Sequence, residues 1–302
     1  MSGVTINGKE YGSIEEYMEE INPTIVEPEN IDDWIYVVED NGTITLNGYK
    51  GQDKEVVIPN YINGVPVKKL GRTHHAYCGP NSRGTFWDPS ICTNNKVGLY
   101  QYIQNDITSV TISEGIEAID YYVFCASQGL TKITIPSSVT SIGGNAFGYC
   151  TSLTEITIPS SVTSIGDGTF ENCASLTEIT IPSSVTSIGD GTFEKCTSLT
   201  EITIPSSVTS IERSVFNNCT SLTKVTIPSS VTSIGYGAFY NCTSLTEVTI
   251  PSSVTTMGEY VFNKIPSIIV HVPWKEGEKP EGWEDGWNNT DSNCTITVDY
   301  AK

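Results

Sequence analysis

The chain has 302 residues, with 35 Asp and Glu against 16 Lys and Arg, so its formal net charge at pH 7 is −19. An acidic chain without a basic patch makes nucleic acid and an anionic membrane surface unexpected partners. It contains no apolar run of about 18 residues, so no membrane-spanning segment is expected. The first 30 residues lack the basic and apolar segments of a signal peptide, so either the protein is not exported by that route or its start has been trimmed.

Residues 1–42 are expected to form an N-terminal cap made of a short helix and a hairpin. The segment Ser13-Ile-Glu-Glu16 is a capping-box pattern, which predicts a helix of about two turns ending at Ile21. Two strand-like segments, 34–38 and 43–46, flank Asp40-Asn-Gly42, and this pattern predicts a hairpin. Its expected role is to cover the first open edge of the structure that follows.

Residues 43–106 are expected to form an irregular first copy of the repeat that continues from residue 107. An insertion at about 72–105 interrupts its second half and has its own composition, with two histidines, two cysteines and an adjacent aromatic pair. Cys and His can bind zinc, but the spacing matches no standard finger. A disulfide and two free thiols are the alternatives, and the aromatic pair could bind a partner or pin the insertion to the repeats. These residues are His74, His75, Cys78, Cys92, Phe86 and Trp87.

The rest of the chain to residue 273 repeats at a step of 23 residues, with seven regular copies from Ile107 onward. A period of this length indicates a solenoid of stacked repeats that cannot fold singly. One aromatic and one cysteine recur in each copy and are expected to form the core, with the cysteines acting as small buried hydrophobes and not as a metal or redox array. These core residues include Phe147, Phe170, Phe193, Phe216, Phe239, Cys150, Cys173, Cys196, Cys219 and Cys242.

One copy, Leu153 to Cys173, shows how the repeat should fold. Its start, Leu153-Thr-Glu-Ile-Thr-Ile-Pro159, has the L-x-x-L-x-L spacing of a leucine-rich repeat and the alternation of a half-buried strand. The proline ends the strand because it has no N–H to donate. Two further apolar residues then return to the interior, and Gly166 is expected to permit a tight or left-handed turn. Residues 274–302, rich in tryptophan, are expected to form a C-terminal cap.

The pattern L-x-x-I-x-I-P-x-x-V-x-x-I-G-x-x-x-F-x-x-C-x-x-L resembles the BspA-like leucine-rich-repeat family over about residues 43–273. The segment Ile44–Tyr49 with Val56–Pro59 is also similar to that family's usual first repeat. The resemblance implies a right-handed leucine-rich-repeat superhelix of the α/β or mainly-β class. It also implies an extracellular or cell-surface protein that binds host or matrix proteins, other bacteria or glycans, and it carries no shared catalytic residues.

The strand positions that should face solvent form columns of Thr and Glu on the concave side. One interpretation is an extended recognition surface. The other is structural: Thr has a high strand propensity, and Glu keeps the surface soluble. Their uniformity argues against a small-molecule pocket, which needs different groups converging on one point. The candidate binding residues here are Thr154, Glu155, Thr157, Thr177, Glu178, Thr180, Thr200, Glu201 and Thr203.

No enzyme motif is present, and no metal or cofactor is expected. The favoured hypothesis is a non-catalytic, monomeric binding or adhesion module that recognises protein or glycan. The alternative is a structural part of a phage or secretion-type assembly that docks, or self-associates, through its caps.

Overall fold

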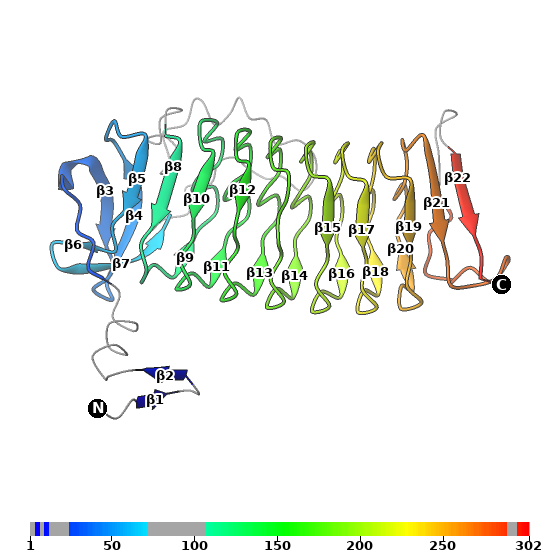
Figure 1. Ribbon diagram of the computed structural model, residues 1–302, viewed down its shortest axis with the longest axis horizontal. Coiled ribbons are helices and arrows are strands. Elements are labelled where there is room, and N and C mark those ends of the chain that lie inside the picture. The colour runs from blue at the N-terminus through cyan, green and yellow to red at the C-terminus, as the bar shows by residue number, and fades with distance from the viewer. Residues whose placement is uncertain (1–3, 7–8, 12–23, 72–106, 289–294, 302) are drawn as a thin grey trace.

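The computed structural model describes residues 4–6, 9–11, 24–71, 107–288 and 295–301, and its strands stack coil upon coil along the long axis (Figure 1). In these ranges the only helix is one 3-10 turn, η1 (Ile31–Asp33). The structure is therefore the leucine-rich-repeat solenoid expected from the sequence, in its mainly-β form. The seven regular repeats are called coils 1 to 7 below and begin at residues 107, 130, 153, 176, 199, 222 and 245.

Each coil contributes up to two short strands, and strands of neighbouring coils pair in parallel, for example Lys132 with Glu155. The first strand of each pair belongs to the set β8 (Ser109–Ile112), β10 (Lys132–Thr134), β12 (Glu155–Ile156), β15 (Glu201–Thr203), β17 (Lys224–Thr226) and β19 (Glu247–Thr249). Their solvent side is called the strand face. The second set is β9 (Ala118–Ile119), β11 (Ser141–Ile142), β13 (Ser164–Ile165), β14 (Ser187–Ile188), β16 (Ser210–Ile211), β18 (Ser233–Ile234) and β20 (Thr256–Met257).

The core is a continuous stack of the repeated apolar side chains. From Phe124 to Phe262 the seven phenylalanine rings are fully buried, with successive centroids 5.4–5.7 Å apart and planes within 10° of parallel. Five cysteines lie beside them, and each thiol contacts a phenylalanine carbonyl of the preceding coil at 3.0–3.2 Å. The core prediction is confirmed, and the cysteines pack as buried hydrophobes that also join coils.

A third ladder runs along the turns that carry the phenylalanines, here called the turn side. In coil 2 the amide of Phe147 donates to the carbonyl of Thr169, 22 positions later, at 2.9 Å. The residues two before and two after Phe147 donate in the same way. The pattern recurs in every coil through coil 6, so the backbone groups of these irregular turns are satisfied by the next coil.

Two residues of each turn have positive φ, and Gly166 is not one of them, so of the two alternatives expected there, a tight or a left-handed turn, the left-handed one is wrong. In coil 3 they are Gly168 (φ 59°) and Asn172 (φ 56°). Gly166 is needed for a different reason: a Cβ there would lie 2.6 Å from the backbone nitrogen of Gly144. Its role is close approach between coils and not left-handed geometry.

The Gly166 position is glycine in five of the seven coils, but coil 5 has Glu212 there and coil 1 has Asp120. A Cβ at Gly189, the same position in coil 4, would lie 2.6 Å from Asp167 N, so a side chain there would crowd the backbone of coil 3. Between coils 4 and 5, in the described residues, neither strand set is paired: β14 ends one sheet and β16 begins another. The turn-side ladder continues here, with Phe193 N donating to Val215 O at 2.9 Å. This interruption is called the seam.

The described residues up to Tyr49 contain two hairpins. Strands β1 (Val4–Ile6) and β2 (Lys9–Tyr11) pair antiparallel, as do β3 (Trp34–Val38) and β4 (Ile44–Tyr49). The second is the hairpin that the sequence predicts, whereas the first was not predicted. The predicted helix at 13–21 lies outside the described residues. The irregular first repeat follows as β5 (Glu55–Ile58), β6 (Tyr61–Ile62) and β7 (Val65–Leu70), with β5 pairing to β8 and β7 to β9.

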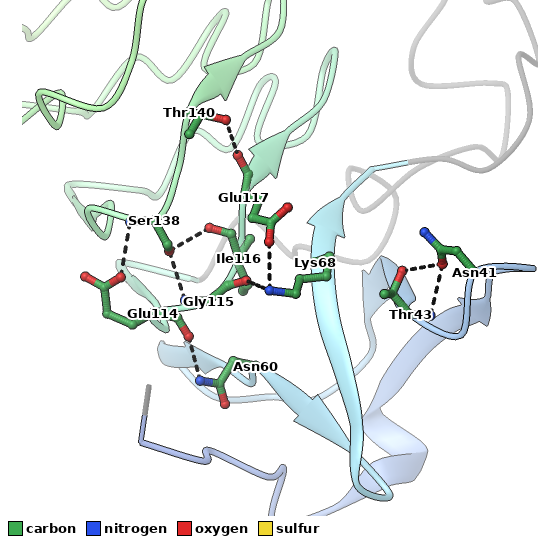
Figure 2. A network of polar contacts seen from close by, with 10 residues as sticks. All are labelled: Asn41, Thr43, Asn60, Lys68, Glu114, Gly115, Ile116, Glu117, Ser138 and Thr140. Carbon is green, nitrogen blue, oxygen red and sulfur yellow. Dashed lines mark hydrogen bonds and ion pairs between the residues drawn. The ribbon is translucent and has the colours of Figure 1, made fainter. Parts of the chain in front are cut away.

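Polar side chains join this first repeat to coil 1 (Figure 2). The buried amide of Asn60 donates to the carbonyls of Thr24 and Glu114 and accepts from the amide of Val26, so its hydrogen-bonding capacity is largely used. Lys68 bridges to the Gly115 carbonyl at 3.2 Å and to the Glu117 carboxylate at 2.7 Å. A buried polar group of this kind is stable only when its partners are all present, so these contacts fix the first repeat on the stack.

The C-terminal end continues the stack with different residues. Strands β21 (Ser267–His271) and β22 (Thr295–Asp299) extend the strand face in parallel beyond β19, as Figure 1 shows. Trp283 is buried. Its backbone forms an isolated parallel β-bridge with Met257, and its indole N–H donates to the Val254 carbonyl. Trp287 meets Phe262 edge-on, with centroids 6.3 Å apart, and so closes the phenylalanine stack.

Candidate functional site

The strand face presents the predicted Thr and Glu columns to solvent. All nine candidate residues in coils 3 to 5 are exposed, and the intervening isoleucines are buried. On the strand face coil 4 forms no regular strand, but a bridge between Thr157 and Thr180 keeps the register. The predicted alternation is therefore observed, whereas a binding role for these residues stays a prediction.

The two threonine columns are not equivalent. The hydroxyls of Thr154, Thr177 and Thr200 donate to the carbonyl of the matching Thr in the preceding coil, at 3.4–3.5 Å. This first column therefore helps to join coils, which supports the structural explanation for it. Within the described part of the chain, the second column (Thr157, Thr180 and Thr203) makes no side-chain hydrogen bond, and neither does the intervening glutamate column of Glu155, Glu178 and Glu201. Those two columns are the groups that a partner could engage.

A second feature lies on the turn side, where a hollow of about 330 Å³ crosses coils 2 to 5. Four carboxylates line it, together with two positive-φ glycines and the side chains of three other residues. The lining is Asn145, Asp167, Gly168, Glu171, Asp190, Gly191, Glu194, Arg213 and Ser214.

The carboxylates of the hollow are engaged within the protein. Asp167 accepts from the amide of Asp190 at 2.9 Å, and Asp190 accepts from the amide of Arg213 at 3.0 Å. Lys195 contacts both Glu171 and Glu194, at 3.3 and 3.1 Å. Burial raises the pKa of the Asp190 carboxyl, and the hydrogen bond from the Arg213 amide partly offsets this rise. The hollow thus has an acidic character that its own backbone and Lys195 stabilise.

The sequence analysis did not identify this hollow, although the sequence contains a signal for it. Positions 144, 167, 190, 213, 236 and 259 should be equivalent, but they read Gly, Asp, Asp, Arg, Tyr and Glu. Variation in an otherwise regular repeat marks positions that the stacking does not constrain. The strand face was favoured because its columns are conspicuous, and their regularity turns out to be partly structural.

The insertion candidates cannot be placed. His74, His75, Cys78, Phe86, Trp87 and Cys92 all lie outside the described residues. In the described part of the chain no group of three or more His, Cys, Asp or Glu side chains is arranged to hold a metal ion, and no helix has the length and apolarity needed to cross a bilayer.

The described cysteines are unsuited to thiol chemistry. All six are buried and none is in a disulfide. Burial raises the pKa of Cys150 and of Cys196 to about 12, with a smaller opposing effect from backbone hydrogen bonds. Because the thiolate is the nucleophile and the metal ligand, these thiols are chemically quiet near neutral pH.

A family model described as the BspA type leucine rich repeat region, with six copies, matches residues 95–223 and 163–274. The chain belongs to this family. A BspA-type protein is a repeat protein of a class that generally serves protein interaction and generally lacks catalytic activity. A search of curated proteins gave no match.

Solved structures show the same fold at low identity. The leucine rich repeat protein of T. pallidum is 23% identical, with a TM-score of 0.58, over 72% of this chain and 89% of that one. A leucine-rich repeat protein from Bacteroides ovatus is also 23% identical, with a TM-score of 0.55, over 89% of this chain and 67% of that one. At this identity the likeness concerns the BspA-type fold alone.

Proposed function

We propose that the chain is a non-catalytic recognition module that binds a protein or glycan on a host or bacterial cell. It acts as a monomer at the cell surface or outside the cell, and the strand face makes the contact. The observation that carries this proposal is the column of unpaired carboxylates formed by Glu155, Glu178 and Glu201 on three successive coils.

Like charges lie side by side within this column, whereas lysines lie beside its two ends, Lys132 opposite Glu155 and Lys224 opposite Glu201. Neighbouring strands lie about 4.8 Å apart, and like charges directly opposite one another destabilise a sheet. The Thr157–Thr180 bridge sets Glu178 beside Glu155, with no lysine between them. Solubility alone would be served by alternating Lys and Glu. A partner that offers cationic or hydroxyl groups at matching intervals would give these carboxylates a favourable role.

The test is binding to intact host and bacterial cells, with affinity measured for three proteins. A triple variant, Glu155→Gln, Glu178→Gln and Glu201→Gln, removes the column while keeping the side-chain size. A control variant, Glu29→Gln, Glu276→Gln and Glu281→Gln, changes the charge equally at exposed sites elsewhere. We expect the first to lose more than about tenfold in affinity, since a hydrogen bond to a charged group contributes about 1.5–3 kcal/mol, and the second to bind like the parent.

Pretreatment of the cells separates the two kinds of partner. Loss of binding after protease treatment indicates a protein, and loss after periodate oxidation indicates a glycan. Equal affinity for all three proteins would refute the strand face as the contact surface.

A second candidate is a structural role in an assembly that docks through the caps. The observation that favours it is the position of β22, which pairs only with β21 among the described strands and so leaves an open sheet edge. Light scattering at increasing concentration checks this candidate, which requires association that a change in β22 abolishes. Adhesion by a monomer requires none.

A further inference from the structure

A single imidazole connects the last three strands of the strand face. His271 lies on β21, between β19 and β22, and its two ring nitrogens contact carboxylates on opposite sides. Nδ1 is 2.6 Å from Asp299 Oδ2 on β22, and Nε2 is 3.0 Å from Glu247 Oε1 on β19. His271 is opposite Thr249 in the register, at the position that threonine holds in coils 2 to 7, so the end of the stack departs from the repeat here.

The geometry determines which protonation state fits. A neutral imidazole has one N–H and one lone pair, so it can donate to only one of the two carboxylates and must present its lone pair to the other. The imidazolium ion has two N–H groups and donates to both. The two short contacts are therefore both favourable only when His271 is charged.

We propose that His271, Glu247 and Asp299 form a pH-sensitive clasp that holds the terminal strand β22 onto the solenoid. In the described part of the chain, Glu247 from β19 and Asp299 from β22 are the charged groups that face the imidazole. Both carboxylates are more than half exposed. The clasp is closed when His271 is protonated and weakens when it loses its proton.

The direction of the pH effect follows from the pKa of His271. The hydrogen bond to Asp299 raises this pKa above its ordinary value, desolvation opposes the rise, and the contact with Glu247 adds to it. A group whose pKa is higher in the folded protein stabilises the fold below the unfolded pKa, about 6.5, and this stabilisation is lost as pH rises through the folded pKa. The clasp therefore opens on the alkaline side.

Strand β22 is suited to respond. It is the last strand of the sheet, and its inward residues Ile296 and Val298 are only partly buried, so little hydrophobic area holds it. Its backbone pairs with β21 over all five residues and is also bonded through Val272 N to Asp299 O at 2.9 Å, but no described strand pairs with its other edge. Opening of the clasp therefore weakens a strand that is held from one side, and release of β22 would uncover the edge of β21.

The first measurement is the pKa of His271 by NMR titration, followed by hydrogen exchange of residues 295–301 across the same pH range. Exchange rates are corrected for their intrinsic pH dependence and compared with those of β10 in the same sample. We expect protection of β22 relative to β10 to fall as pH rises through the measured pKa, by about tenfold for each unit by which that pKa is raised. His74 and His75 give separate resonances that variants at those positions identify.

Two variants make the test specific. His271→Gln keeps one donor but cannot titrate, so we expect weaker protection of β22 with no pH dependence. Glu55→Gln is the matched control, because it changes an exposed carboxylate on β5, which pairs with β8 at the other end of the stack, and it should keep the parent profile. The proposal is overturned if the His271 pKa lies at or below its ordinary value, or if β22 exchange in His271→Gln follows the same pH profile as in the parent.

Discussion

The phenylalanine stack makes Phe193→Ala the most informative single substitution. Phe193 lies in coil 4 and is fully buried, with the rings of Phe170 and Phe216 at 5.6 and 5.7 Å on either side and planes within 6° of parallel. Truncation to alanine removes burial and leaves a cavity between two rigid coils, which costs about 3–5 kcal/mol. Aromatic pairs add about 0.5–1.5 kcal/mol each beyond burial, so the loss of two places the expected cost near 5 kcal/mol.

Phe124→Ala is the control for the number of stacked rings. Phe124 is as fully buried as Phe193, but it has one described ring neighbour, Phe147, where Phe193 has two. It should cost less than Phe193→Ala by about one aromatic pair. Urea unfolding measures both, with far-UV circular dichroism to follow the coils. All five tryptophans lie outside residues 107–273, so their fluorescence gives a signal separate from that of the seven coils. A cost below about 1 kcal/mol for Phe193→Ala would contradict the role of the stack.

Three further predictions follow from contacts between coils. Gly235→Ala adds a Cβ that would lie 2.7 Å from Arg213 N, so it should destabilise by about 1–3 kcal/mol in urea melts, whereas Ser252→Ala at an exposed turn should change stability by less than about 0.5 kcal/mol. Glu212→Gly should restore strand pairing across the seam and raise the free energy of unfolding by about 1 kcal/mol. The reason is that two regained backbone hydrogen bonds outweigh the entropic cost of glycine. An unchanged urea midpoint would show that the seam has another cause. Of the nine cysteines, at most three should react with a thiol reagent at pH 8 in the native protein and all nine in denaturant after reduction, and faster labelling of the ladder cysteines would contradict their burial.

The repeat could be predicted from the sequence because each coil confirms its neighbours. Where one copy deviates at a position, the other six copies still show which residue type belongs there. The core, the strands and the alternation of the strand face therefore all follow from the period. The role of Gly166 could not be read in this way. The sequence shows that glycine recurs at this position. Only the structure shows why: a Cβ at residue 166 would lie 2.6 Å from Gly144 N, so glycine is needed for space between coils and not for a positive φ.

The parts that escaped prediction are those where the repeat is broken. The β1–β2 hairpin was missed although Asn7-Gly8, a strong hairpin signal, stands between its two strands in the sequence. The clasp at His271 depends on β22, which returns to the sheet from 24 positions further along the chain, and no local pattern specifies that pairing. The acidic hollow depends on residues of four coils meeting at one place, which becomes apparent only when the coils are stacked.

The seam at Glu212 has a mechanical consequence. Tension applied along the rod would be carried there by the turn-side ladder, the phenylalanine contacts, one backbone hydrogen bond from Thr200 N to Thr177 O and a few side-chain bonds. Most other junctions also share the load with a paired strand. Coils 1–4 and coils 5–7 would then part as two blocks before either one unravelled. A pulled molecule would extend in two steps, and the lengths released would report where the chain divides.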